Sequence, residues 1–168
     1  FAEMEKRINY DALDAQGKIS YRLVETKVRR DEAKRPYIYY SYPVEQMHGV
    51  QSEIPSFLIN VHRIDSVPDA EAYIARLEGM PGLMRQVIQK LDKRAEMNII
   101  PPKFVFPLVI GDCENIIGGA PFKWGSGTSP LWEDFQSKVG KADIEGSEKE
   151  RLLEKGRQAI LDSVDAAY

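Results

Sequence analysis

His48, His62 and Cys113 are the residues of this sequence whose types most readily do chemistry. A zinc site generally needs three or four His, Cys, Asp or Glu ligands at suitable spacing. His48 is followed by Gly49 and His62 by Arg63, so neither histidine begins a His-Glu-x-x-His motif. The sequence therefore indicates no catalytic residue and no metal ligand within this chain.

The single cysteine, Cys113, lies among Val109, Ile110, Ile116 and Ile117. This setting favours a small buried hydrophobic residue over a functional thiol. A Cys-His nucleophile pair is formally available, but no feature of the sequence places a histidine beside the cysteine. One cysteine cannot form an intrachain disulfide, so cysteine usage excludes neither the cytoplasm nor the periplasm.

The most suggestive polar cluster is Gln46, His48 and Gln51, which lies in an expected loop next to several tyrosines. These side chains could satisfy backbone groups of the loop, which is the commoner role, or they could line a substrate cleft. Asp112 and Asn115 pose the same choice on an otherwise apolar helix. They either face water or are buried polar groups whose partners lie in sequence outside this chain.

Composition limits the class of protein and its partners. With 43% hydrophobic and 29% charged residues, the 168-residue chain can fold around a core of its own. A net charge of −3 gives no electrostatic reason to expect nucleic acid as a partner. No apolar run approaches the ~20 residues that a transmembrane helix needs.

Hydrophobic periodicity predicts an all-α fold of helical hairpins, forming a single helical unit over residues 1–168. Residues 37–42 are rich in tyrosine and lie between Pro36 and Pro43, which allows at most one short extended segment or edge strand. Residues 43–55 are expected to be irregular. The expected helices cover residues 3–34, as one long helix or as two with a break at Gly17, and residues 56–64, 66–78, 82–97, 102–118, 131–139 and 147–168.

Two helix starts carry specific signals. Ser66 can cap the next helix, Pro68 suits its first turn, and Asp69 suits its positive end. Residues 147–150, Ser-Glu-Lys-Glu, have the pattern of a capping box.

Helix breaks are predicted at three places. Gly79-Met80-Pro81-Gly82 is expected to separate two helices of a hairpin, and Asn98 can adopt the left-handed conformation that ends the second. Pro107 predicts a late start or a kink in the helix of residues 102–118.

The chain opens on Phe1 without an initiator methionine and ends at Tyr168 without a helix stop signal. We therefore expect it to be an N-terminal fragment of a larger protein.

The order of segments resembles the N-terminal part of a bacterial family known as domain of unknown function eight-eight-five. Three stretches carry the resemblance over roughly the first two thirds of the chain, whereas the remainder fits by its helical pattern. They are residues 19–23 (Ile-Ser-Tyr-Arg-Leu), residues 42–51 (Tyr-Pro-Val-Glu-Gln-Met-His-Gly-Val-Gln), which match a Pro-x-x-Gln-x-x-Gly-x-Gln loop, and residues 69–77 with Pro81 and residues 99–103. The family commonly has glycine where this chain has Arg94 and Asn98.

The resemblance implies a mainly helical, zinc-dependent metallopeptidase-like enzyme, often a secreted or lipid-anchored envelope protein. Its metal motif, His-Glu-x-x-Pro-Gly-His, would lie downstream. No position of this sequence matches that motif, so no catalytic or metal residue is carried over. The implied partners are the remainder of the same polypeptide and a peptide substrate.

Two functions follow as hypotheses. In the first, the chain is the N-terminal helical portion of such a protein and shapes one wall of its substrate cleft, with Gln46, His48 and Gln51 facing the cleft. In the alternative, it is a non-catalytic helical binding or scaffold module.

Overall fold

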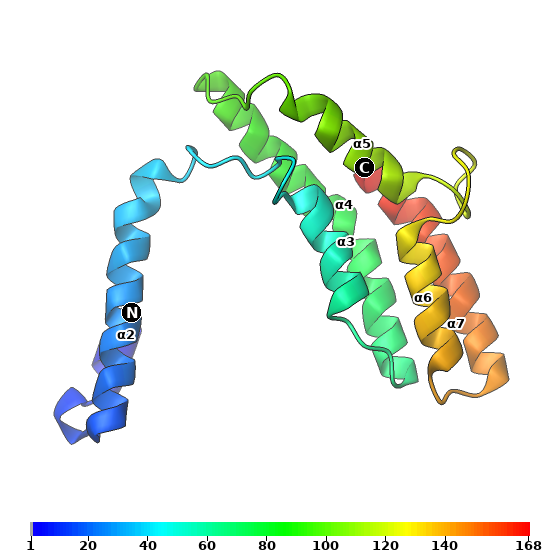
Figure 1. The fold of residues 1–168 in the computed structure, drawn as a ribbon. Helices are drawn as coiled ribbons and strands as arrows, with labels where there is room; N and C mark the ends of the chain where they lie inside the picture. Colours follow the sequence, from blue (N-terminus) through cyan, green and yellow to red (C-terminus); the bar gives the residue numbers. More distant parts are fainter. Residues whose placement is uncertain (1) are drawn as a thin grey trace. The chain divides into compact units, whose positions relative to one another are not determined.

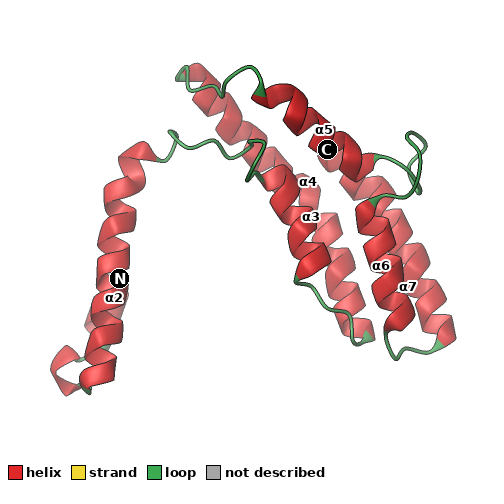
Figure 2. Cartoon of the chain, in the orientation of Figure 1, coloured by secondary structure: helices red, strands yellow, loops and turns green. Residues whose placement is uncertain are grey.

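The computed structural model describes residues 2–168, apart from the side chains of Ala2 and Met4. Helices joined by loops account for this described part, and it contains no strand (Figure 2). One isolated bridge pairs Ala120 with Thr128. The predicted all-α class is confirmed. The chain divides into two compact units, one up to Ser41 and one from Tyr42 to Tyr168.

The first unit consists of two helices and two 3-10 turns: α1 (Ala2–Arg7), the turn Tyr10–Ala12, α2 (Ala15–Lys34) and the turn Arg35–Tyr37. Of the two alternatives for residues 3–34, the structure has two helices, but the break lies before Gly17, because α2 already begins at Ala15. Asp14 caps α2, and its Oδ1 accepts a hydrogen bond from the Gly17 amide at 2.7 Å. Residues 37–42 form turns rather than a strand, since Tyr40 N donates to the Tyr37 carbonyl at 3.0 Å.

The second unit carries the remaining helices (Figure 1). They are α3 (Val50–Asn60), α4 (Val67–Glu96), α5 (Val105–Ile117), α6 (Pro130–Lys141), α7 (Gly146–Ala159), a π-helical turn (Ile160–Val164) and α8 (Asp165–Ala167). None of the helices in the described residues combines the length and the apolar character that crossing a membrane requires.

The predicted hairpin at Gly79–Gly82 is wrong, because α4 runs through these residues as one helix of 30 residues. Its buried face continues across the glycines with Leu77, Met80 and Met84. Burial of each such side chain contributes about 1.5–3 kcal/mol. Together they outweigh the cost of roughly 3 kcal/mol for Pro81 inside the helix.

Helix α3 also differs from expectation, since it begins at Val50 rather than near Ser56 and contains Pro55. Proline lacks the amide that would bond to the carbonyl four residues earlier. The Gln51 carbonyl, which this leaves free, instead accepts a hydrogen bond from the Tyr168 hydroxyl at 2.6 Å.

Other local predictions had mixed outcomes. Asn98 has the left-handed φ of 57°, and α5 starts late as Pro107 indicated. Ser66 makes no side-chain cap, and instead its hydroxyl donates to Asp69 at 2.6 Å. The capping box at Ser147 is not formed, because α7 already begins at Gly146.

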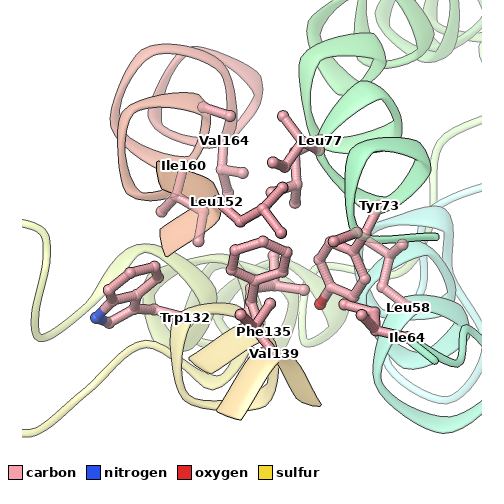
Figure 3. Close-up of a cluster of buried hydrophobic side chains, with 14 of the residues drawn as sticks. Leu58, Ile64, Tyr73, Leu77, Trp132, Phe135, Val139, Leu152, Ile160 and Val164 are labelled. Carbon is pink, nitrogen blue, oxygen red and sulfur yellow. The ribbon is translucent and has the colours of Figure 1, made fainter. Parts of the chain in front are cut away.

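The core lies where α3, α4, α6 and α7 meet (Figure 3). Tyr73 and Leu77 of α4, Phe135 of α6 and Leu152 of α7 are fully buried there. Gly156 of α7 lies directly against Phe135, and a Cβ at this position would be 2.2 Å from a ring carbon. The absence of a side chain at Gly156 therefore sets the close approach of α6 and α7.

A polar network ties three of these helices together at the edge of the core. The Tyr73 hydroxyl donates to Asp134 at 2.9 Å, and Lys138 forms an ion pair with Asp134 at 2.8 Å. Lys138 also donates to the carbonyls of Leu58 and Ile59 at 2.7 and 2.8 Å. It thereby satisfies two carbonyls at the C-terminal end of α3, which helix geometry leaves without partners.

Candidate functional site

The loop of residues 42–49, called here the 42–49 loop, leads into α3 and is fixed at both ends. Val50 N donates to the Pro43 carbonyl at 3.0 Å, and the Tyr42 hydroxyl donates to the Ile100 carbonyl at 3.4 Å. Within the loop, His48 N donates to the Glu45 carboxylate at 2.6 Å. The loop is thus folded on itself and held against the turn that follows α4.

Gln51 fastens the 42–49 loop to the helices. Its side chain is only 3% exposed, and Nε2 donates to the Glu45 carbonyl at 2.7 Å and to Asp112 of α5 at 3.4 Å. Oε1 is buried without a hydrogen-bond partner among the described residues. A Cβ at Gly49 would lie 2.0 Å from Oε1, so the loop can pass this close to Gln51 because residue 49 is glycine.

The three predicted substrate-binding residues therefore differ in position. Gln46 is half-buried and His48 is exposed, both in the 42–49 loop, whereas Gln51 lies buried in the first turn of α3. In the described part of the chain, hydrogen bonds link Gln51 to Glu45 and Asp112 but not to Gln46 or His48. Gln51 acts on the position of the loop, and the two other side chains can reach a ligand.

Asp112 and Asn115, two polar residues of the apolar helix α5, differ in burial. Asp112 is half-buried against Gln51, while Asn115 is exposed. Both line a shallow crevice of about 180 Å³ between α3 and α5. The sequence signalled these two residues by their polarity within an apolar helix, but it gave no sign that Gln51 and Asp112 would meet.

The thiol of Cys113 is half-buried rather than fully buried as predicted. Burial raises the pKa of the Cys113 thiol, and the neighbouring Asp112 carboxylate raises it further. The thiolate form that a nucleophile requires is thereby disfavoured. Cys113 does not have the environment of a reactive cysteine.

His62 is engaged in the core, in the turn between α3 and α4. Its Nε2 lies 3.0 Å from the Asp69 carbonyl, and Nδ1 faces the guanidinium of Arg76. A carbonyl at one nitrogen and a donor at the other select the neutral ring with the proton on Nε2. Burial lowers the pKa of His62, and the positive charge of Arg76 also lowers it.

The residues described here provide no group of three His, Cys, Asp or Glu side chains that could hold a metal ion. The two histidines have different surroundings, because His48 lies in the 42–49 loop and His62 lies beside Arg76. The donor set of this part of the chain does not fit a zinc site, which needs at least three protein ligands.

An apolar groove of about 490 Å³ lies between the C-terminal half of α4 and α5, and it is called here the α4–α5 groove. Residues of the 42–49 loop and of the turn after α4 also line it. Its lining includes two charged residues, Asp92 and Arg94, among otherwise apolar or aromatic ones. Its lining residues include Tyr42, Leu91, Ile100, Phe106, Val109 and Ile110.

Fold and site together define a helical protein in which Gln51 holds the 42–49 loop beside the apolar α4–α5 groove. The model of a family described as "Bacterial protein of unknown function (DUF885)" matches residues 1–168. The chain belongs to this family, as its loop and helix segments indicated.

A solved structure shares the fold of this chain. It is described as the crystal structure of the "putative lipoprotein" from Colwellia psychrerythraea, and it superposes with a TM-score of 0.69 at 24% sequence identity. The match covers 76% of this chain and 21% of that protein, so the chain corresponds to about a fifth of its length. No curated protein matches this chain.

Proposed function

We propose that this chain is the N-terminal helical portion of a larger zinc-dependent metallopeptidase-like protein of the bacterial cell envelope, in which it shapes one wall of a substrate cleft. The observation that supports this most is the family match over residues 1–168, combined with a structural neighbour about five times as long as the matched segment. The description of that neighbour as a lipoprotein supports an envelope location.

The 42–49 loop is the part of the chain that we assign to the cleft wall. Gln51 holds the loop through Glu45, and the loop presents Gln46 and His48 at the surface. An amide and an imidazole can each donate to and accept from a peptide backbone. Both side chains are therefore suited to bind an extended peptide, while Gln51 keeps the loop in position.

Zinc, when bound, would activate a water molecule for attack on a peptide carbonyl. Its ligands would come from the rest of the polypeptide, because the donor set of the described residues does not fit the metal. The role of this chain is restricted to binding and orienting the substrate.

The test is to express the complete gene product and to assay peptide hydrolysis with and without zinc. The double variant Gln46→Ala/His48→Ala should raise KM with little change in kcat, because it removes groups that bind substrate away from the reacting bond. Gln136→Ala, on the exposed face of α6, serves as the control. Unchanged kinetics in the double variant would remove the loop from the cleft, and a frame without the downstream zinc motif would refute the metallopeptidase itself.

A second function, a non-catalytic helical binding module, is favoured by the α4–α5 groove, because its size lies within the range of ligand-binding pockets. This function requires that the 168-residue chain binds its ligand without any additional part of a longer protein. The gene test separates the two, since a reading frame that stops at or near Tyr168 would favour the binding module.

A further inference from the structure

Helix α5 has an unusual distribution of apolar surface. Of its 13 residues only Val105 is buried, although most of the helix is apolar. Phe106 and Ile110 are 46% and 54% exposed on the groove side. Apolar surface of this extent on one face generally marks an interaction site.

The α4–α5 groove collects part of this surface into a concave site. Leu91 on α4 and Val109 on α5 line it, together with Tyr42 and Ile100. The hydrogen bond from Tyr42 to the Ile100 carbonyl fixes these two residues relative to each other. The groove is therefore built into the fold, and it does not depend on a ligand for its shape.

The lining determines what kind of segment fits. An extended peptide brings backbone amides and carbonyls that need partners, and an apolar wall offers almost none. A helix satisfies its own backbone groups and can lay an apolar face against two other helices. The groove is thus suited to a helix whose inward face is apolar.

The source of that helix follows from the extent of the surface and from the comparison with known structures. A small apolar ligand would fill the groove but leave Phe104 and Leu108, which are outside its lining, exposed. The structural neighbour has about four fifths of its length beyond the matched segment, which is enough chain to cover both. We infer that an apolar helix from the rest of the same polypeptide docks in the α4–α5 groove. This inference rests on the part of the proposed function that makes the chain a portion of a longer protein, and it is independent of zinc and of peptidase activity.

The inference is tested by cysteine labelling in a Cys113→Ala background. Phe106→Cys and Ile110→Cys place a thiol on the groove, and Lys155→Cys on the exposed side of α7 is the control. Maleimide labelling rates are measured in the 168-residue chain and in the complete gene product. Circular dichroism checks that each variant is folded, and both groove positions are already solvent-accessible, so the substitutions should be tolerated.

The expected result is that both groove thiols react readily in the 168-residue chain and at least about tenfold more slowly in the complete protein, while Lys155→Cys is unchanged. Equal rates in the two proteins would overturn the inference. Concentration-dependent protection within the 168-residue chain would also overturn it, because the occupant would then be a second copy. A reading frame ending at Tyr168 leaves no helix to dock and rejects it as well. Groove protection without peptidase activity would refute the proposed enzyme and leave the docking intact.

Discussion

Substituting Gly156 with alanine tests whether the contact between α6 and α7 is as close as the structure has it. A Cβ at position 156 would lie 2.2 and 2.7 Å from two ring carbons of Phe135, which is fully buried. Neither partner can move freely, because the ring is enclosed by the core and Gly156 is in the middle of a helix.

Two opposing terms set the magnitude. Alanine in place of glycine within a helix is worth about 1 kcal/mol in favour of the folded state. Overpacking a core costs typically about 1–3 kcal/mol, and a contact this short belongs at the upper end. We expect Gly156→Ala to lower the free energy of unfolding by about 1–2 kcal/mol, measured by urea denaturation with far-ultraviolet circular dichroism.

Gly79→Ala is the matched control, since Gly79 is also inside a helix but a Cβ there would meet nothing within 4 Å. It should raise the free energy of unfolding by about 1 kcal/mol. In a Phe135→Leu background, which removes the ring, the penalty of Gly156→Ala should largely disappear. A Gly156→Ala protein as stable as Gly79→Ala would refute the close packing of α6 on α7.

Three further predictions follow from single contacts. Tyr168→Phe leaves the buried Gln51 carbonyl without a partner and should lower the free energy of unfolding in urea by about 1–3 kcal/mol, whereas an unchanged value would show that the hydroxyl bond is absent in solution. Pro81→Ala restores a backbone amide inside α4 and should raise that free energy by about 1–3 kcal/mol, and a loss of stability instead would mean that the helix needs the proline. Because the pKa of His62 is lowered in the folded state by burial and by Arg76, the unfolded chain binds more protons, so stability should fall as the pH drops below about 6.5. Thermal melts between pH 7 and pH 5 should show a smaller decline for His62→Gln, and identical slopes would contradict this role of the histidine.

The fold class could be predicted from the sequence, because the 3.6-residue periodicity of α4, α5, α6 and α7 is visible in the local order of apolar and polar residues. Asn98 was predictable for the same reason, since its left-handed conformation depends on the side chain and its immediate neighbours. Such features need no knowledge of distant contacts.

The errors lie where tertiary contacts overrule local preference. Pro81 and the adjacent glycines predict a break, but buried residues on both sides hold α4 together. Pro55 predicts an irregular segment, but the hydroxyl of Tyr168 satisfies the carbonyl that the proline leaves free. No local pattern could reveal a partner 117 residues away in the sequence.

The candidate site shows the same division. The sequence identified Gln46, His48 and Gln51 as one polar cluster, because they are close in the chain and different in type from their surroundings. Burial separates them in the structure, with Gln51 turned toward Asp112 and His48 toward solvent. The roles of loop support and ligand contact depend on this difference, which spacing alone does not contain.

The π-helical turn at Ile160–Val164 has a consequence for how the chain tolerates insertions and deletions. Each residue of an α-helix turns the chain by about 100°, and the wider π turn takes up one additional residue at that point. Everything after it, Tyr168 included, is rotated relative to an uninterrupted α-helix. Deleting one residue from this turn would leave a smoother helix but carry the terminal hydroxyl away from α3. The π-helical turn thus rotates the last residues of the helix so that the Tyr168 hydroxyl can reach the Gln51 carbonyl, 117 positions earlier in the sequence.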